Sequence, residues 1–181
     1  MSSCNDNNII IRKETKQEDL KDFRELLSSS GFFYDYEIEA AEDFLKYQLE
    51  DGDESGIHYY MAEDKSVDGG KVIGFICFGF DTCTLTSWLL YWMGVHNDYR
   101  SKGLGGRLLK KFEEYVISKG GKKIVLETAG RELYKPTRDF YEKYGYREEG
   151  IVPDYYSEGD ARVTYVKDVG WINGSNKCWR S

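Results

Sequence analysis

The sequence predicts an α/β fold in which about four helices flank a mixed, mostly antiparallel sheet of six to seven strands. Three strand-like runs, IHYYMAE, KVIGFICFGF and LTSWLLYWMGV, are separated only by the turn-forming segments SVDGG and DTCT, which is typical of an antiparallel meander. An amphipathic helix comes next, because apolar residues recur at every fourth position, at Leu104, Leu108, Phe112 and Val116. A strand-like run after this helix indicates one parallel crossover. We therefore expect a single domain over residues 1–181, with tails at 1–8 and 170–181.

The N-terminal elements follow from local signals. Residues 9–11 form a β-branched run that predicts the first strand. Thr15 and Glu18 have the spacing of a capping box, so a helix is expected from there to Gly31. A second amphipathic helix, ended by Gly52, is expected to bury the face formed by Ile38, Ala41, Phe44, Leu45 and Leu49.

The C-terminal elements are equally regular. KIVLET at 123–128 predicts a buried strand, and Pro136 fits the first turn of another helix. Gly145 fits the position just after the end of that helix. Two further strands, near 146–152 and 161–169, complete the sheet.

Composition narrows the function classes. The chain has 25 Lys and Arg against 32 Asp and Glu, a net charge of −7, which disfavours non-specific binding to nucleic acid. It contains no apolar stretch of about 18 residues, and MSSCNDNN lacks the apolar centre of a secretory signal, so we expect a cytoplasmic protein without a membrane partner. We expect no metal site, because His58 and His96 are the only histidines and the cysteines have no metal-like spacing: Cys4, Cys77, Cys83 and Cys178.

One segment opposes the acidic balance. YRSKGLGGRLLKK at 99–111 contains three glycines and five basic residues and leads into the predicted helix. The first turn of a helix presents backbone N–H groups without internal partners, and glycines allow an anion to approach them closely. The segment lacks the Gly-Lys-Ser/Thr of a P-loop and the third glycine of a dinucleotide fingerprint. It predicts a phosphate or pyrophosphate site, although a glycine-rich connection into a solvated surface helix and a nucleotide site stay open.

Two motifs resemble those of the GNAT superfamily of acyl-CoA-dependent N-acetyltransferases. VHNDYRSKGLGGRLL resembles the acyl-CoA-binding motif, with Arg100, Gly103 and Gly105 at its defining positions. FYEKYGY at 140–146 resembles the second motif, an aromatic-Tyr pair followed by Gly and an aromatic residue. The resemblance extends over residues 9–169 and implies the GNAT fold and acetyl-CoA as the cosubstrate.

The resemblance also implies roles for individual residues. The pantetheine arm would pair with the backbone of Met93, Gly94 and Val95, and the basic side chains would be free for the outer phosphates. Tyr141 would be the general acid. The pyrophosphate would bind along the glycine-rich turn, formed by Arg100, Ser101, Lys102, Gly103, Leu104, Gly105 and Gly106.

The general base is less clearly indicated. Many relatives have a Glu on the strand before the glycine-rich turn, whereas residues 88–92 contain no carboxylate. Glu127 corresponds to the Glu that serves in the branch acetylating protein N-termini, and partial desolvation by its strand would raise its pKa. That branch has an Asn where this chain has Tyr134, so the resemblance does not extend to the branch itself.

The acceptor is expected between the aromatic loop predicted at 31–36 and the segment 153–160, both of which are rich in Tyr and Asp. Acidic and aromatic walls suit a cationic amine, on a small molecule or a peptide. The candidate contacts are Tyr34, Tyr36, Tyr155 and Tyr156. A catalytically weak acyl-CoA-binding sensor is the alternative function, and the sequence leaves a homodimer open.

Overall fold

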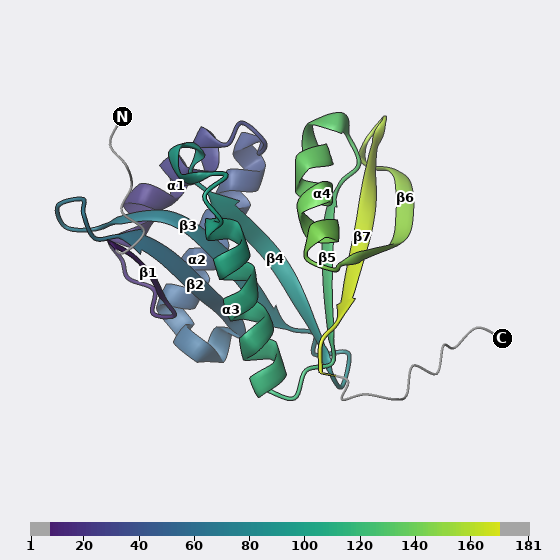
Figure 1. The fold of residues 1–181 in the computed structure, drawn as a ribbon, viewed down its shortest axis with the longest axis horizontal. Coiled ribbons are helices and arrows are strands. Elements are labelled where there is room, and N and C mark those ends of the chain that lie inside the picture. The colour runs from purple at the N-terminus through teal and green to yellow at the C-terminus, as the bar shows by residue number, and fades with distance from the viewer. Residues whose placement is uncertain (1–7, 171–181) are drawn as a thin grey trace.

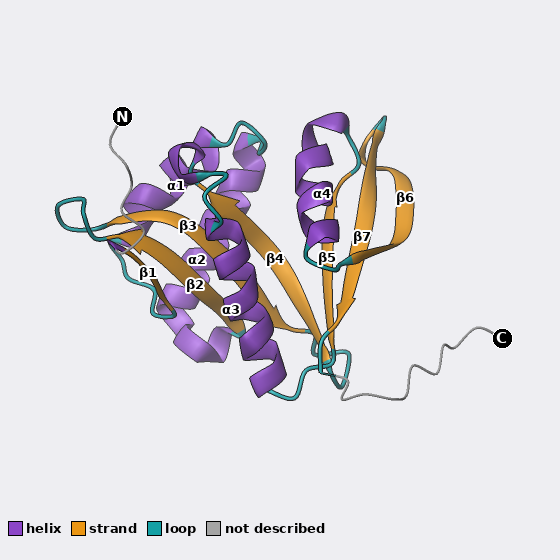
Figure 2. Ribbon diagram, in the orientation of Figure 1, coloured by secondary structure: helices purple, strands orange, loops and turns teal. Residues whose placement is uncertain are grey.

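The computed structural model describes residues 8–170, and Cys4, Cys178 and most of both expected tails lie outside that range (Figures 1 and 2). The described chain forms one seven-stranded sheet in the order β1-β2-β3-β4-β5-β7-β6. The strands are β1 (Ile9–Arg12), β2 (Ile57–Asp64), β3 (Lys71–Phe80), β4 (Ser87–Val95), β5 (Lys123–Ala129), β6 (Arg147–Ser157) and β7 (Asp160–Asp168). The predicted fold class is confirmed.

Four α-helices cover the sheet. They are α1 (Asp19–Ser29), α2 (Asp35–Asp51), α3 (Leu104–Ser118) and α4 (Lys135–Lys143). Short 3-10 helices, η2 (Gly52–Ser55), η3 (Asn97–Tyr99) and η4 (Glu132–Tyr134), lie between them. In Figure 1, α3 crosses the near face of the sheet while α1 and α2 lie behind it, and α4 covers the strands at the C-terminal end.

Two apolar clusters correspond to these two faces. One contains Phe112 and the rest of the predicted α3 stripe, all buried, together with inward residues of β3, β5 and β7. The other joins α1 and α2 to β2 and β3, with Phe23 and Phe75 in ring contact at 4.4 Å. Each fully buried Phe contributes roughly 1.5–3 kcal/mol by leaving water. As expected for a central strand, β3 is buried on both faces.

The only parallel pairing in the described sheet joins β4 to β5, from Ser87 opposite Lys123 to Leu90 opposite Leu126. The α3 crossover connects these two strands, as predicted. Between Cys77 and Phe78 the β3–β4 register shifts, which leaves Tyr91 as an extra residue on β4. A bulge bends its strand, and β4 leaves β5 directly after this position (Figure 1).

Three local predictions are wrong. The Thr15–Glu18 capping box does not form, because the Thr15 hydroxyl donates to Gln48 instead, and no side chain caps α1 at Glu18. Tyr36 lies in the first turn of α2 rather than in a loop. Residues 153–157 belong to β6, because a register shift after Val152 and a positive φ of 52° at Asp154 let the strand continue past Pro153.

Candidate functional site

The glycine-rich turn has the backbone of an anion site. Ser101 and Gly103 have positive φ angles of 60° and 79°, a conformation that glycine adopts at low cost. Within residues 8–170, the backbone N–H groups of residues 101–106 donate to no acceptor. The next N–H group, that of Arg107, is the first to bond, to the Gly103 carbonyl. These N–H groups and the positive end of the α3 dipole favour a bound anion there.

Each basic side chain of this segment has a partner within the protein, although Lys110 and Lys111 remain largely exposed. Arg100 Nε donates to the Val95 carbonyl at 3.1 Å, Lys102 Nζ donates to the Asp98 carbonyl at 2.7 Å, and Arg107 Nη2 donates to the Ile9 carbonyl at 3.1 Å. Lys110 and Lys111 lie 4.0 and 3.4 Å from Glu114. The backbone N–H groups of the turn are therefore its first donors to an anion.

The C-terminal half of β4 has one open edge. Met93 and Gly94 pair with β3 opposite Ile76 and Phe75. On the other side, no strand of the described chain pairs with β4 beyond Leu90. Open N–H and C=O groups on a strand edge can pair with an extended, amide-containing molecule.

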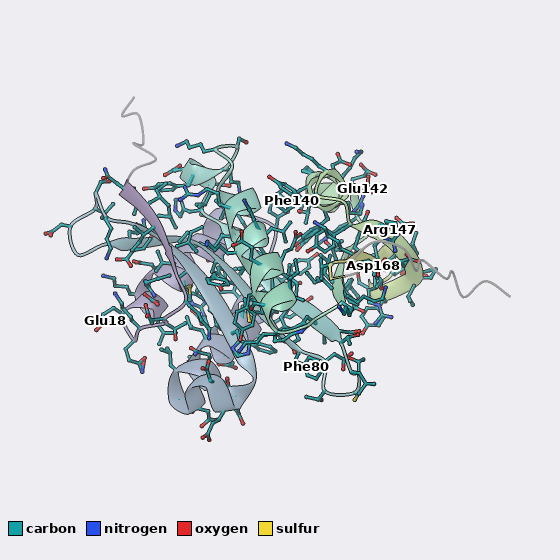
Figure 3. The ribbon with its side chains drawn as sticks, turned by 60° about the horizontal axis from the view of Figure 1, so that its bottom comes forward. Glu18, Phe80, Phe140, Glu142, Arg147 and Asp168 are labelled. Atoms are coloured by element: carbon teal, nitrogen blue, oxygen red, sulfur yellow. The ribbon has the colours of Figure 1, made fainter. Side chains whose placement is uncertain are left out.

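The glycines at the start of α3 allow the neighbouring elements to approach. A side chain at Gly105 would contact the Met93 methyl at 3.3 Å and the Phe140 ring at 3.4 Å, so this position faces β4 and α4. Figure 3 shows Phe140 on the side of α4 that faces α3. A side chain at Gly106 would overlap the Tyr144 hydroxyl. These glycines thus hold the turn against the second motif.

A cavity of about 710 Å³ opens where β4 and β5 diverge. Its walls come from segment 33–37, residues 89–93 of β4, residues 125–129 of β5, the η4–α4 region and the end of β6. The predicted site residues that line it are Met93, Glu127, Tyr141, Tyr34, Tyr36 and Tyr156. Tyr155 and residues 100–106 do not line it, although Met93 connects the cavity to Gly105.

Tyr141 is held on α4 by a cluster of aromatic rings. Its ring is buried and lies 5.4 Å from Phe140, 5.6 Å from Tyr146 and 6.3 Å from Tyr165, measured between centroids. Its hydroxyl makes no hydrogen bond to any other described residue. Burial raises the pKa of Tyr141, which keeps the hydroxyl protonated and able to donate.

Glu127 does not have the desolvated environment that the sequence predicted. Its side chain is 44% exposed, and Oε1 lies 3.3 Å from Nη1 of Arg162. It faces Tyr156, where burial, followed by the Glu127 charge, raises the pKa of Tyr156 to about 12. The outward-facing position of Glu127 on β5, next to β7, explains this exposure.

Sequence reasoning missed three charged residues of the cavity. Glu37 accepts a hydrogen bond from the Tyr34 backbone N–H at 2.8 Å. Asp160 is buried and lies 3.4 Å from Nε of Arg131. Glu37 directly follows the segment 31–36, and Asp160 is the last residue of the segment 153–160, so the sequence weakly indicated that both lie near the acceptor. Nothing in the sequence indicated Arg131.

The four candidate acceptor tyrosines are paired and exposed. Tyr34 and Tyr36 stack with centroids 5.6 Å apart and ring planes at 15°. Tyr155 and Tyr156 meet edge to face at 5.0 Å, with the Arg162 guanidinium 4.3 Å from the Tyr155 ring. Three of the four line the cavity, and Tyr155 lies behind Tyr156.

In the range 8–170, no group of three or more His, Cys, Asp or Glu side chains is arranged to hold a metal ion. No helix in that range has the length and apolarity needed to span a membrane.

Known acetyltransferases resemble this chain in sequence and in fold. An uncharacterised N-acetyltransferase of Methanocaldococcus jannaschii is 30% identical over 110 residues, which cover 60% of this chain and only 65% of that protein. A structure from Desulfovibrio desulfuricans, assigned to the GNAT family of acetyltransferases, superposes with a TM-score of 0.84 at 29% identity, over 90% of this chain and 99% of that one.

An aminoglycoside 6′-N-acetyltransferase complexed with coenzyme A shares the fold, with a TM-score of 0.67 at 22% identity, over 91% of this chain and 99% of that one. The family model described as "Acetyltransferase (GNAT) family" matches residues 20–146, which is more than half of the chain. The protein therefore belongs to the GNAT family of acetyltransferases.

Proposed function

We propose that this protein is a single-domain N-acetyltransferase, residues 1–181, that moves the acetyl group of acetyl-CoA directly to a primary amine of a small molecule or peptide. The observation that carries the proposal is the set of unbonded N–H groups at residues 101–106 beside the open edge of β4. Family membership and the similarity in fold to a coenzyme A complex support the same cosubstrate.

The residues present fit an acyl-CoA. Backbone N–H groups without acceptors suit a pyrophosphate, and the open edge of β4 at Met93–Val95 suits the amides of a pantetheine arm. When bound, acetyl-CoA supplies a thioester. Transfer forms a C–N bond, breaks the C–S bond and moves one proton from the amine to the departing sulfur. A backbone N–H of β4 would stabilise the developing oxyanion.

Proton transfer is assigned to side chains of the cavity. Tyr141 would hold the proton that the departing sulfur receives, since this residue lines the cavity and its raised pKa keeps the hydroxyl neutral. The attacking amine must lose a proton, and Glu127 would accept it through water, because its exposed carboxylate suits a solvent-mediated route better than direct contact.

The acceptor is assigned from the walls of the cavity. Glu37, Glu127 and Asp160 line it with a single Arg among the described lining residues, and tyrosine rings form its rim. This combination favours a cationic amine over an anionic acceptor. The proposal includes a cytoplasmic location and no nucleic-acid or membrane partner. A homodimer is the oligomeric state to test first.

The alternative function is an acyl-CoA sensor without turnover, and the ion pair between Glu127 and Arg162 is the observation that favours it. One experiment separates the two. Purified protein is mixed with acetyl-CoA and a panel of amines that includes diamines, aminosugars and peptides, and free thiol is followed with mass detection of the product. We expect an acetylated amine. Calorimetric binding of acetyl-CoA with no thiol release for any amine would support the sensor.

A further inference from the structure

Arg131 bridges two parts of the chain that are far apart in sequence. It lies just before η4, and its side chain lines the cavity. Its Nη1 donates to the Tyr34 hydroxyl, and its Nη2 donates to the Phe32 carbonyl at 3.4 Å. Both acceptors belong to the segment between α1 and α2, which lies 97 to 99 residues before Arg131 in the sequence.

The guanidinium is enclosed as well as bonded. Its carbon lies 4.6 Å from the centroid of the Tyr34 ring and 5.0 Å from that of the Tyr134 ring. On its third side, Nε lies 3.4 Å from Asp160 Oδ2, while the Asp160 carboxylate also faces the Arg131 backbone N–H at 3.4 Å. Its charge is therefore met by Asp160, although Nε makes no hydrogen bond, while Nη1 and Nη2 donate to segment 32–34 and the guanidinium contacts two tyrosine rings.

The other contacts of segment 32–34 show what depends on Arg131. Phe32 has further partners, since its carbonyl accepts from the Tyr134 hydroxyl at 3.0 Å and its ring meets Tyr134 at 5.4 Å. Tyr34 is 51% exposed. Its hydroxyl accepts from Arg131 and its ring stacks on Tyr36, while its backbone caps α2 through Glu37 and Ile38. Arg131 is thus the link from the C-terminal half of the cavity to the Tyr34–Tyr36 pair.

We propose that Arg131 is a specificity-determining residue, which holds Tyr34 and Tyr36 as one wall of the acceptor cavity and so favours slender amines over bulky ones. The inference rests on the proposed N-acetyltransferase function. An unbranched chain can reach past a fixed aromatic wall, whereas a ring amine needs the wall to move. Releasing Tyr34 should lower the cost of admitting a ring and remove the contact that a slender cation makes with the wall.

The test compares the wild type with Arg131→Ala, Arg131→Lys and the control Arg147→Ala. Arg147 is an exposed arginine on β6 that pairs with Asp168, beside it in Figure 3, and with Glu149, and it does not line the cavity. Hydrogen exchange of peptides spanning residues 31–38 reports on the wall without requiring activity. Steady-state acetylation of 1,5-diaminopentane and of kanamycin A reports on selectivity.

We expect exchange in residues 32–36 to be about tenfold faster in Arg131→Ala than in the wild type. We expect KM for the diamine to rise about tenfold with kcat within about threefold, and the kcat/KM ratio of kanamycin A to diamine to rise about tenfold. Arg131→Lys keeps the positive charge beside Asp160 but loses the planar guanidinium with its two Nη donors. Its amine selectivity should therefore lie between those of the wild type and Arg131→Ala. Arg147→Ala should match the wild type in all three measurements.

The outcomes are distinguishable. Unchanged exchange at 32–36 in Arg131→Ala, in an enzyme that still acetylates amines, would overturn this inference and leave the proposed function standing. Faster exchange with an unchanged kcat/KM ratio of kanamycin A to diamine would mean that Arg131 is only a structural contact, and this result would also overturn the inference. A wild-type protein that acetylates no amine would overturn the proposed function, and the specificity role with it.

Discussion

Arg100 Nε donates a hydrogen bond to the carbonyl oxygen of Val95, 3.1 Å away, so the first basic side chain of the glycine-rich turn points back to the end of β4. The same guanidinium lies 4.9 Å from the Phe32 ring. Its burial lowers the pKa of Arg100 from its ordinary value, as expected for a cation removed from solvent. Arg100 therefore braces the turn against β4 and the α1–α2 segment.

Replacing Arg100 with Met should lower the free energy of unfolding by about 1–2 kcal/mol, because a charged hydrogen bond to a partly buried carbonyl is lost. The salt dependence of coenzyme A binding should stay that of the wild type, since the Arg100 guanidinium is directed toward the Val95 carbonyl and the Phe32 ring. Denaturant unfolding and calorimetry at several salt concentrations measure the two effects. A weaker salt dependence with unchanged stability would show that Arg100 is a phosphate ligand instead.

The Tyr144 hydroxyl occupies the space next to Gly106 where a side chain would begin. Gly106→Ala should therefore lower the free energy of unfolding by about 1–3 kcal/mol through overpacking between α3 and α4. Gly105→Ala is the matched control, since its methyl group would meet Met93 and Phe140 at 3.3–3.4 Å. Alanine also favours the helix by roughly 1 kcal/mol, so this variant should be near neutral. Equal effects at both positions would contradict the geometry.

The sequence could predict the parts of the fold that depend on local periodicity. The stripe through Leu104 and Val116 identified α3 because its spacing matches the helix period, and the glycine-rich turn was visible for the same local reason. The continuation of β6 past Pro153 was missed because Pro, Asp and Gly ordinarily indicate a loop.

The acceptor wall was not predictable in the same way. Arg131 meets Tyr34 and Phe32 across separations of 97 and 99 residues, and nothing near Arg131 in the sequence indicates those partners. The ion pair of Glu127 was not predictable for the same reason, because its partner Arg162 lies on the neighbouring strand β7. Long-range pairs of charged residues become visible only when the sheet order is known.

Arg12 is the centre of a buried ion-pair network that joins β1 to α1 and β2. Its side chain is 9% exposed and binds Asp19 through Nη2 and Glu63 through Nε, the latter at 2.7 Å. Arg12→Met would leave both carboxylates buried without this partner, which should cost about 3–5 kcal/mol of unfolding free energy. Denaturant unfolding measures the loss. Lys13→Met removes a 3.7 Å pair with Asp53 at the surface and a contact of the ammonium group with the Tyr115 ring at 5.2 Å, so it should change stability by only about 1 kcal/mol.

The loss caused by Arg12→Met should depend on pH. Burial alone would raise the pKa of Glu63, but hydrogen bonds from Lys65 and Arg12 outweigh burial and hold the pKa below its ordinary value. A carboxylate with a lowered pKa contributes stability above its unfolded pKa and loses it as the pH falls. The difference between wild type and Arg12→Met should therefore shrink below about pH 4. A difference that is constant from pH 7 to pH 3 would exclude the ion pairs as its cause.

Tyr141 gives the sharpest test of the mechanism. Tyr141→Phe should lower kcat about 10²-fold, the range of general acid catalysis, and leave acetyl-CoA affinity near that of the wild type. Because burial raises the pKa of Tyr141 above the ordinary value of about 10, the wild-type kcat should not fall between pH 7 and pH 10. Over that range kcat should rise or stay level, since the amine loses its proton while the tyrosine keeps its own.

The control is Tyr165→Phe, because Tyr165 packs 6.3 Å from the Tyr141 ring but donates its hydroxyl to Glu142 and does not line the cavity. It should retain wild-type kcat even if its stability falls. The measurements are kcat against pH for the three proteins and calorimetric affinity for acetyl-CoA. A fully active Tyr141→Phe would remove this hydroxyl from proton transfer. The wild-type kcat could instead begin to decrease at a pH well under 10, with no such decrease in Tyr141→Phe. That result would mean that the Tyr141 hydroxyl ionises in spite of its burial.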